Sequence, residues 1–99
     1  MADTPTTPTV VTVEAMRDYL RIDGTANDKL LSDYIDAATV YVTRTTGATA
    51  EQQAANPLAR AAVKMLVAEW YDPQGIDATA SDRAVTEMLK HITGGENNG

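Results

Sequence analysis

The stretch from Asn56 to Tyr71 constrains the possible folds more than any other part of this sequence. Asn56 followed by Pro57 is a strong helix start, because asparagine caps the first turn and proline lacks an amide hydrogen that would find no partner there. The residues that follow, LARAAVKMLVAEWY, are apolar on nearly every side of a helix. Such a helix has to be central, and its many alanines let other helices approach closely. The sequence therefore predicts a helix over residues 57–71 that is the most buried element of the protein.

A second long helix is predicted over residues 28–46. Asn27 is in position to cap it, and Gly47 follows the last turn, where a left-handed residue commonly ends a helix. Between these limits apolar residues recur at the spacing of one buried helical stripe. The stripe comprises Leu30, Leu31, Tyr34, Ile35, Ala38, Tyr41, Val42 and Thr45, with Asp33, Asp36, Thr39 and Thr43 off it.

Two shorter helices complete the expected fold. The first covers residues 13–20, with Thr12 as N-cap and Glu14 in the first turn, where the helix dipole favours negative charge. The last covers residues 81–92 and is capped by Thr79. The expected inward residues of these two helices are Val13, Met16, Tyr19 in part, Leu20, Val85, Met88, Leu89 and Ile92.

The remaining segments divide the chain into a helical domain, residues 11–93, and two tails. Residues 1–10 hold two prolines and four threonines, which predicts a flexible N-terminal arm. Residues 94–99 predict a flexible C-terminal tail, and the Ala/Gln-rich connector at 48–55 has room for a partial turn. Proline and glycine end the third helix, so residues 72–80 are expected to form a long loop. The predicted fold class is all-α: a small four-helix domain with a long loop between its third and fourth helices and extended tails.

Composition excludes several classes of site. The chain has no cysteine, so a disulfide, a thiolate metal site and a cysteine nucleophile are impossible. It has no twenty-residue apolar run and no secretory leader pattern, so no membrane association is expected. The net charge of −6 disfavours tight binding of nucleic acid. The acidity gives solubility, and it also suits the wall of a channel through which DNA slides; both interpretations stay open.

The sequence offers no convincing catalytic or ligand-binding pattern. The single histidine, His91, lies one turn after Glu87 near a predicted helix end, where the helix dipole stabilises a positive charge. A catalytic pair of His91 and Glu87 would also need a nucleophile, and the sequence indicates none beside them. Asp33 and Asp36 have no third ligand in register, and residues 23–28 lack the ligand spacing and closing glutamate of a calcium loop. We therefore expect a protein that is not an enzyme and that uses no cofactor and no metal.

Three segments follow one another in an order that matches a known architecture. They are the step YLRID at residues 19–23, a helix opening DKLLSDYIDAA at residue 28, and a helix end AEWY at residues 68–71 before a polar loop and a short last helix. Over residues 10–92 this order resembles the head-tail connector family of long-tailed phages. The family pattern often has basic residues after the aromatic helix end, where this chain has Asp72-Pro73-Gln74-Gly75.

The resemblance implies a structural virion subunit in the neck of the particle, assembled in the host cytoplasm. Such connectors form a ring, usually dodecameric, between the portal protein and a stopper or tail-completion protein. They extend the DNA channel, and DNA passes through as cargo. A different class also fits the sequence, namely a small cytosolic regulatory adaptor that binds one protein partner through a helical groove.

A closed ring requires that one face of each subunit meets a different face of the next. We expect these faces on the outward side of the 28–46 helix and at the end of the 57–71 helix with its loop. Aromatic side chains supply contact area there, and charges set register. Trp70 and Tyr71 are also suited to cover one side of a core that has no phenylalanine. Both roles, covering the core and contacting a neighbouring subunit, stay open. The predicted partner-interface residues are Asp33, Asp36, Arg44, Trp70, Tyr71 and Ile76.

Overall fold

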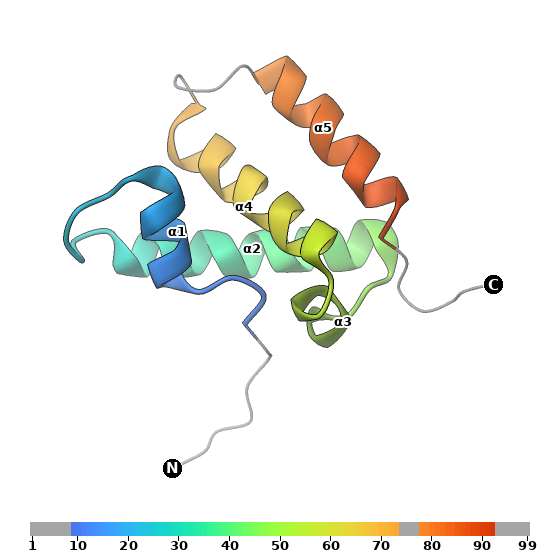
Figure 1. Ribbon diagram of the computed structural model, residues 1–99, viewed down its shortest axis with the longest axis horizontal. Coiled ribbons are helices and arrows are strands. Elements are labelled where there is room, and N and C mark those ends of the chain that lie inside the picture. The colour runs from blue at the N-terminus through green and yellow to red at the C-terminus, as the bar shows by residue number, and fades with distance from the viewer. Residues whose placement is uncertain (1–8, 74–77, 93–99) are drawn as a thin grey trace, which may run out of the picture.

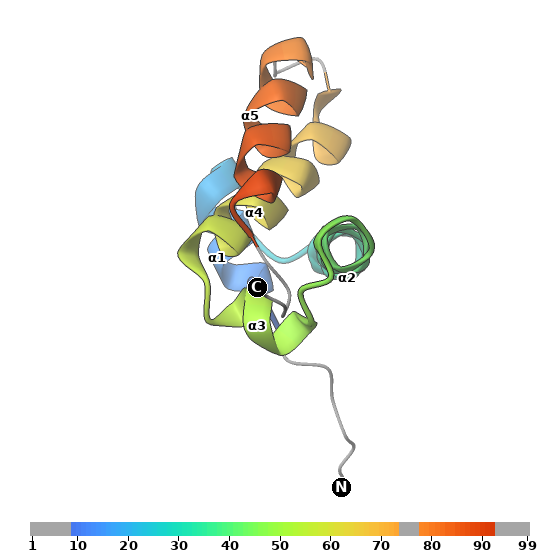
Figure 2. The same cartoon turned by 90° about the vertical axis from the view of Figure 1, so that its right-hand side faces the viewer.

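The computed structural model describes residues 9–73 and 78–92, with the backbone alone for residues 78–82. These parts contain no strand, so the predicted all-α class is confirmed. Figures 1 and 2 show two layers, with α2 in one and α1, α4 and α5 in the other. The helices are α1 (Val13–Leu20), α2 (Asp28–Thr46), α3 (Ala50–Ala54), α4 (Pro57–Tyr71) and α5 (Ala78–Lys90).

The predicted boundaries of α1, α2 and α4 are confirmed, because local signals determine them. The Thr12 hydroxyl accepts a hydrogen bond from the Ala15 amide at 3.0 Å and caps α1. Asn56 Oδ1 accepts one from the Leu58 amide at 2.9 Å and caps α4. Gly47 ends α2 with a φ of 83°, which a residue without Cβ adopts readily.

The YLRID step forms the C-terminal end of α1. Arg21 takes the left-handed conformation with a φ of 59°, and the Ile22 amide donates to the Arg17 carbonyl at 2.9 Å. This is a Schellman ending in which arginine occupies a position that usually holds glycine. Arg17 Nε then lies 3.1 Å from Asp28 Oδ1, which links α1 to the start of α2.

The connector at residues 48–55 contains a helix, α3, so the described parts hold five helices where the sequence predicted four. A reciprocal capping box between Thr49 and Gln52 starts this helix. The side chain of Gln53, which belongs to this helix, is fully buried. Its side-chain amide nitrogen donates to the Thr39 carbonyl at 3.2 Å, the Thr43 hydroxyl at 2.9 Å and the Ala48 carbonyl at 3.0 Å. Gln53 thereby clamps α3 to the second half of α2.

The last helix is displaced from its predicted range of 81–92. It begins at Ala78, so Thr79 lies within the helix and is not its N-cap. The alanines at 78 and 80 are strong helix formers, which accounts for the earlier start. The helix ends at Lys90, yet Ile92 remains buried. Of the predicted loop at 72–80, residues 78–80 belong to α5, and residues 74–77 lie outside the described part.

α4 is the centre of the domain, as predicted. It contacts each of the other described helices. Six of its 15 residues are buried, compared with five of 19 in α2, so it is the more buried of the two long helices. Among the described helices none has both the length and the apolar character needed to cross a membrane.

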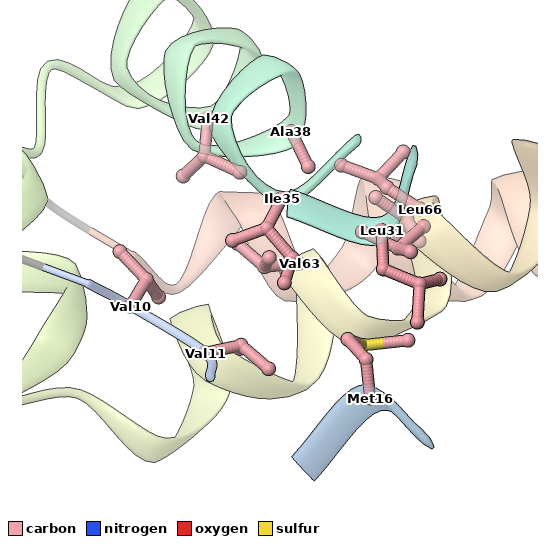
Figure 3. Close-up of a cluster of buried hydrophobic side chains, with 11 residues drawn as sticks. Val10, Val11, Met16, Leu31, Ile35, Ala38, Val42, Val63 and Leu66 are labelled. Atoms are coloured by element: carbon pink, nitrogen blue, oxygen red, sulfur yellow. The ribbon is translucent and has the colours of Figure 1, made fainter. Parts of the chain in front are cut away.

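The main core lies where α1, α2 and α4 meet. Figure 3 shows side chains from these helices converging with Val10 and Val11, which precede α1. Val10 is 4% exposed, so the buried part of the chain begins inside the stretch assigned to the N-terminal arm; residues 1–8 lie outside the described part. The principal members of the cluster are Val10, Val11, Met16, Leu31, Ile35, Ala38, Val42, Val63, Leu66, Val67 and Val85.

The buried stripe of α2 is narrower than predicted. Leu30 and Tyr41 are 41% and 44% exposed, and Thr45 is also exposed. Thr39, predicted to lie off the stripe, is buried, and its hydroxyl donates to the Ile35 carbonyl at 2.8 Å. That hydrogen bond makes burial of the hydroxyl tolerable. The stripe is therefore shifted toward Thr39, and its opposite edge is left in solvent.

Candidate functional site

The outward side of α2 exposes a strip of apolar side chains. Leu30, Val40 and Tyr41 are 41%, 51% and 44% exposed, and Ala37 is exposed between them. At 3.6 residues per turn these positions fall on one side of the helix, away from buried residues such as Ile35. We call this surface the outer face of α2. It comprises Leu30, Asp33, Asp36, Ala37, Val40, Tyr41 and Arg44.

Charged residues lie among these apolar side chains on the same side of the helix. Asp33, Asp36 and Arg44 are exposed, so the three α2 residues predicted for the interface share one surface. Asp33 accepts a hydrogen bond from Lys29 Nζ at 2.8 Å. This hydrogen bond and the charge of Asp33 raise the pKa of Lys29 above its ordinary value of 10.5, and the charge of Asp36 adds to the shift.

The aromatic pair at the end of α4 makes contacts inside the domain. The Trp70 ring meets the Tyr34 ring edge-on, with centroids 6.0 Å apart and planes at 64°. The Tyr71 hydroxyl accepts a hydrogen bond from Asn27 Nδ2 at 2.9 Å. Both side chains are half-buried against the main core, which supports their role in covering it. Ile76 lies outside the described residues, so this second predicted face stays a prediction.

A shallow groove runs between α1 and the exposed side of α4. It has a volume of about 300 Å³ and is lined by Tyr19, Pro57, Arg60, Ala61, Lys64 and Met65. Lys64 Nζ lies 5.8 Å from the centroid of the Tyr19 ring, at the distance of a cation–π contact. Arg60 Nη1 donates to the Ala54 carbonyl at 2.7 Å, which holds the guanidinium at the groove. We call this surface the α1–α4 groove.

The sequence prediction missed the α1–α4 groove and the apolar part of the outer face of α2. One signal was available for α2: Val40 lies well off the predicted stripe, yet it is large and apolar. Tyr19 carried a weaker signal, because it was expected to be partly buried and is 49% exposed. The groove itself depends on how α1 crosses α4, a relation between segments some 40 residues apart that no local pattern encodes.

The residues considered for chemistry do not form a reactive arrangement. Glu87 pairs with Lys90 Nζ at 3.0 Å, while His91 follows the end of α5 and is exposed. Over residues 9–73 and 83–92, no group of histidine, aspartate and glutamate side chains is placed to hold a metal ion.

Comparison with known protein families gives a match that covers most of the chain. The model of the family described as "Phage gp6-like head-tail connector protein" matches residues 10–93. This range includes every described helix from α1 to α5. Searches of curated proteins and of solved structures find no match.

Proposed function

Because this chain belongs to the phage gp6-like head-tail connector family, whose members are structural proteins of the virion, we propose that it forms the connector ring between portal and tail. In this role it contacts the portal protein on one side and a stopper or tail-completion protein on the other. It catalyses no reaction and needs no cofactor. Assembly takes place in the host cytoplasm, and the finished ring occupies the neck of the particle.

The observation that carries the ring proposal is the outer face of α2. A small monomeric domain rarely gathers large apolar residues on one exposed side of a helix, and such a gathering usually marks a contact surface. Leu30, Val40 and Tyr41 are each more than 40% exposed there. Asp33, Asp36 and Arg44 on the same face supply charges that favour one register of docking over others.

The charge of the chain supports a channel role for the ring. Fourteen acidic residues against eight basic ones give a net charge of −6 per subunit. Each neutralised phosphate adds to the affinity for DNA, so a ring of acidic subunits holds passing DNA weakly. DNA in this proposal is cargo that moves through the ring, and the ring reads no base sequence.

A gene deletion in the phage that carries this chain tests the proposal. We expect heads that fill with DNA but cannot retain it or accept tails, and the defect should be rescued by supplying the protein from a plasmid. Electron microscopy of the rescued particles should show density of the ring between portal and tail. Normal tailed particles in the deletion strain would contradict the proposal.

A further inference from the structure

The outer face of α2 and the α1–α4 groove belong to different layers of the domain. In Figure 2, α2 is seen end-on at the right, while α1 and the first half of α4 lie at the left. The buried side of α2 faces α4, so its outer face is directed away from the α1 and α4 layer. Two unlike surfaces on opposite sides of a subunit are the arrangement from which head-to-tail contacts build a ring.

The two surfaces have matching apolar content. The outer face of α2 presents Leu30, Val40 and Tyr41 as exposed apolar side chains spread over about three turns of helix. The groove presents the Tyr19 ring, 49% exposed, together with Met65. Leu58, 40% exposed, is seven residues before Met65 and so borders the groove on the same side of α4. The apolar side chains of the outer face of α2 can therefore pack against the apolar side chains of the α1–α4 groove.

The two surfaces carry opposite charges, and some of these charges form no ion pair within the described part of the subunit. Lys64 contacts the Tyr19 ring and has no carboxylate partner among the described residues. Asp36 is exposed and makes no ion pair within the described part of the chain; it only adds to the electrostatic field at Lys29. Arg60 adds a second positive charge to the groove. The groove is therefore basic on a chain that is acidic overall.

From these observations we propose that the outer face of α2 in one subunit docks into the α1–α4 groove of the next subunit, with Asp36 facing Lys64 across the contact. The inference rests on the proposed ring and specifies which surfaces build it. The occupant of the groove is a second copy of this chain. The apolar side chains of the outer face of α2 supply the buried area, and the pairing of Asp36 with Lys64 selects the register.

Disulfide trapping tests the contact directly, because the chain has no cysteine of its own. The variant Ala37→Cys/Ala61→Cys places one thiol on the outer face of α2 and one in the groove. In rings assembled on purified portal we expect oxidation to yield a ladder of linked subunits. Each single-cysteine variant should yield dimers at most. Portal-bound rings of the double variant that give no ladder would overturn the docking contact and leave the proposed ring intact.

Charge exchange provides a second readout. Lys64→Glu and Asp36→Lys should each weaken subunit association roughly tenfold or more, because like charges then meet at the contact. The double variant should recover most of the loss. Arg83→Glu is the matched control, since it reverses an exposed positive charge on α5, and it should assemble normally. Lys64→Glu that abolishes portal binding yet preserves subunit association would assign the groove to the portal and overturn this proposal. Failure of the unmodified chain to form any ring on portal would overturn the proposed function together with it.

Discussion

The side-chain amide of Asn27 donates a hydrogen bond to the hydroxyl of Tyr71 at 2.9 Å, across 44 residues of sequence. Asn27 occupies the N-cap position of α2, but its side chain makes no capping hydrogen bond, contrary to the sequence prediction. Its amide instead joins the start of α2 to the end of α4. The edge-on contact of Trp70 with Tyr34 joins the same two helices about two turns further along α2. These two contacts fix one end of the crossing between the two longest helices.

Removal of the Tyr71 hydroxyl should lower the stability of the fold. Tyr71→Phe deletes only the acceptor, so we expect a loss of about 1 kcal/mol in the free energy of unfolding. Asn27→Ala should cost a similar amount, and the double variant should cost less than the sum because both changes remove one bond. Urea denaturation of the four proteins measures this coupling. Strictly additive losses would mean that the bond contributes nothing.

Loss of the Gln53 clamp should destabilise the domain more strongly. Gln53→Leu keeps much of the buried volume but strips hydrogen-bond donors from three acceptors on α2 and the α2–α3 turn. The Thr39 carbonyl keeps its helical partner, but the buried Ala48 carbonyl loses its hydrogen bond to Gln53, and a buried acceptor without a partner costs about 1–3 kcal/mol, so a loss in that range is expected. Thermal unfolding followed by circular dichroism measures it.

The neighbouring Gln52 supplies the control for this prediction. Its side chain is exposed and only accepts the Thr49 amide in the capping box. Gln52→Ala should therefore cost less than about 1 kcal/mol. Equal losses for Gln52→Ala and Gln53→Leu would show that the buried amide has no special role.

Sequence reasoning succeeded where the determining interactions are local. The caps at Thr12 and Asn56 and the stop at Gly47 act within a few residues, so they are readable from the chain. The burial of Gln53 and the partner of Asn27 depend on contacts 10 or more residues away, and the sequence showed neither. A helix over 50–54 was missed because five residues provide too few turns for a periodic pattern.

The candidate site was also predictable only in part. Asp33, Asp36 and Arg44 were placed on the outward side of α2 because charges avoid the buried stripe. The exposure of Leu30 and Tyr41 could not be predicted in this way. A stripe shows which side of a helix is apolar, whereas the width that becomes covered depends on how the neighbouring helices cross it.

The ion pair of Lys29 with Asp33 should be visible in alkaline titration. The pKa of Lys29 is raised in the folded protein, so the stabilisation from its charge is fully present below its unfolded pKa. That stabilisation is lost as the pH rises through the folded pKa, above about 10.5. Asp33→Asn removes the principal cause, and NMR titration of the Lys29 side chain should then give a lower pKa. An unchanged pKa would mean that the pair does not persist in solution.

An acidic substitution in the core should prevent folding, whereas the same change at the surface of the same helix should not. Leu66 is 5% exposed within the main core, and a buried carboxylate without a partner costs several kcal/mol against a total stability of about 5–15 kcal/mol. Leu66→Asp should therefore give an unfolded chain by circular dichroism. Leu58 is 40% exposed, so Leu58→Asp should fold. A folded Leu66→Asp protein would show that the core assignment is wrong.

Substitutions of Val40 should affect assembly of the ring without affecting the folding of the subunit. Its side chain is 51% exposed on the outer face of α2, and valine and aspartate have similar helix propensities, so Val40→Asp should change stability by no more than about 0.5 kcal/mol. In the proposed ring this side chain is covered by the neighbouring subunit, where a carboxylate without a partner is costly. Val40→Asp should thus remain folded but fail to form rings on portal. Val40→Thr, which keeps the branched shape and adds no charge, should assemble. Negative-stain electron microscopy of portal mixed with each variant distinguishes the outcomes. Rings from Val40→Asp would remove the outer face of α2 from the interface, and an unfolded Val40→Asp protein would assign Val40 to the core.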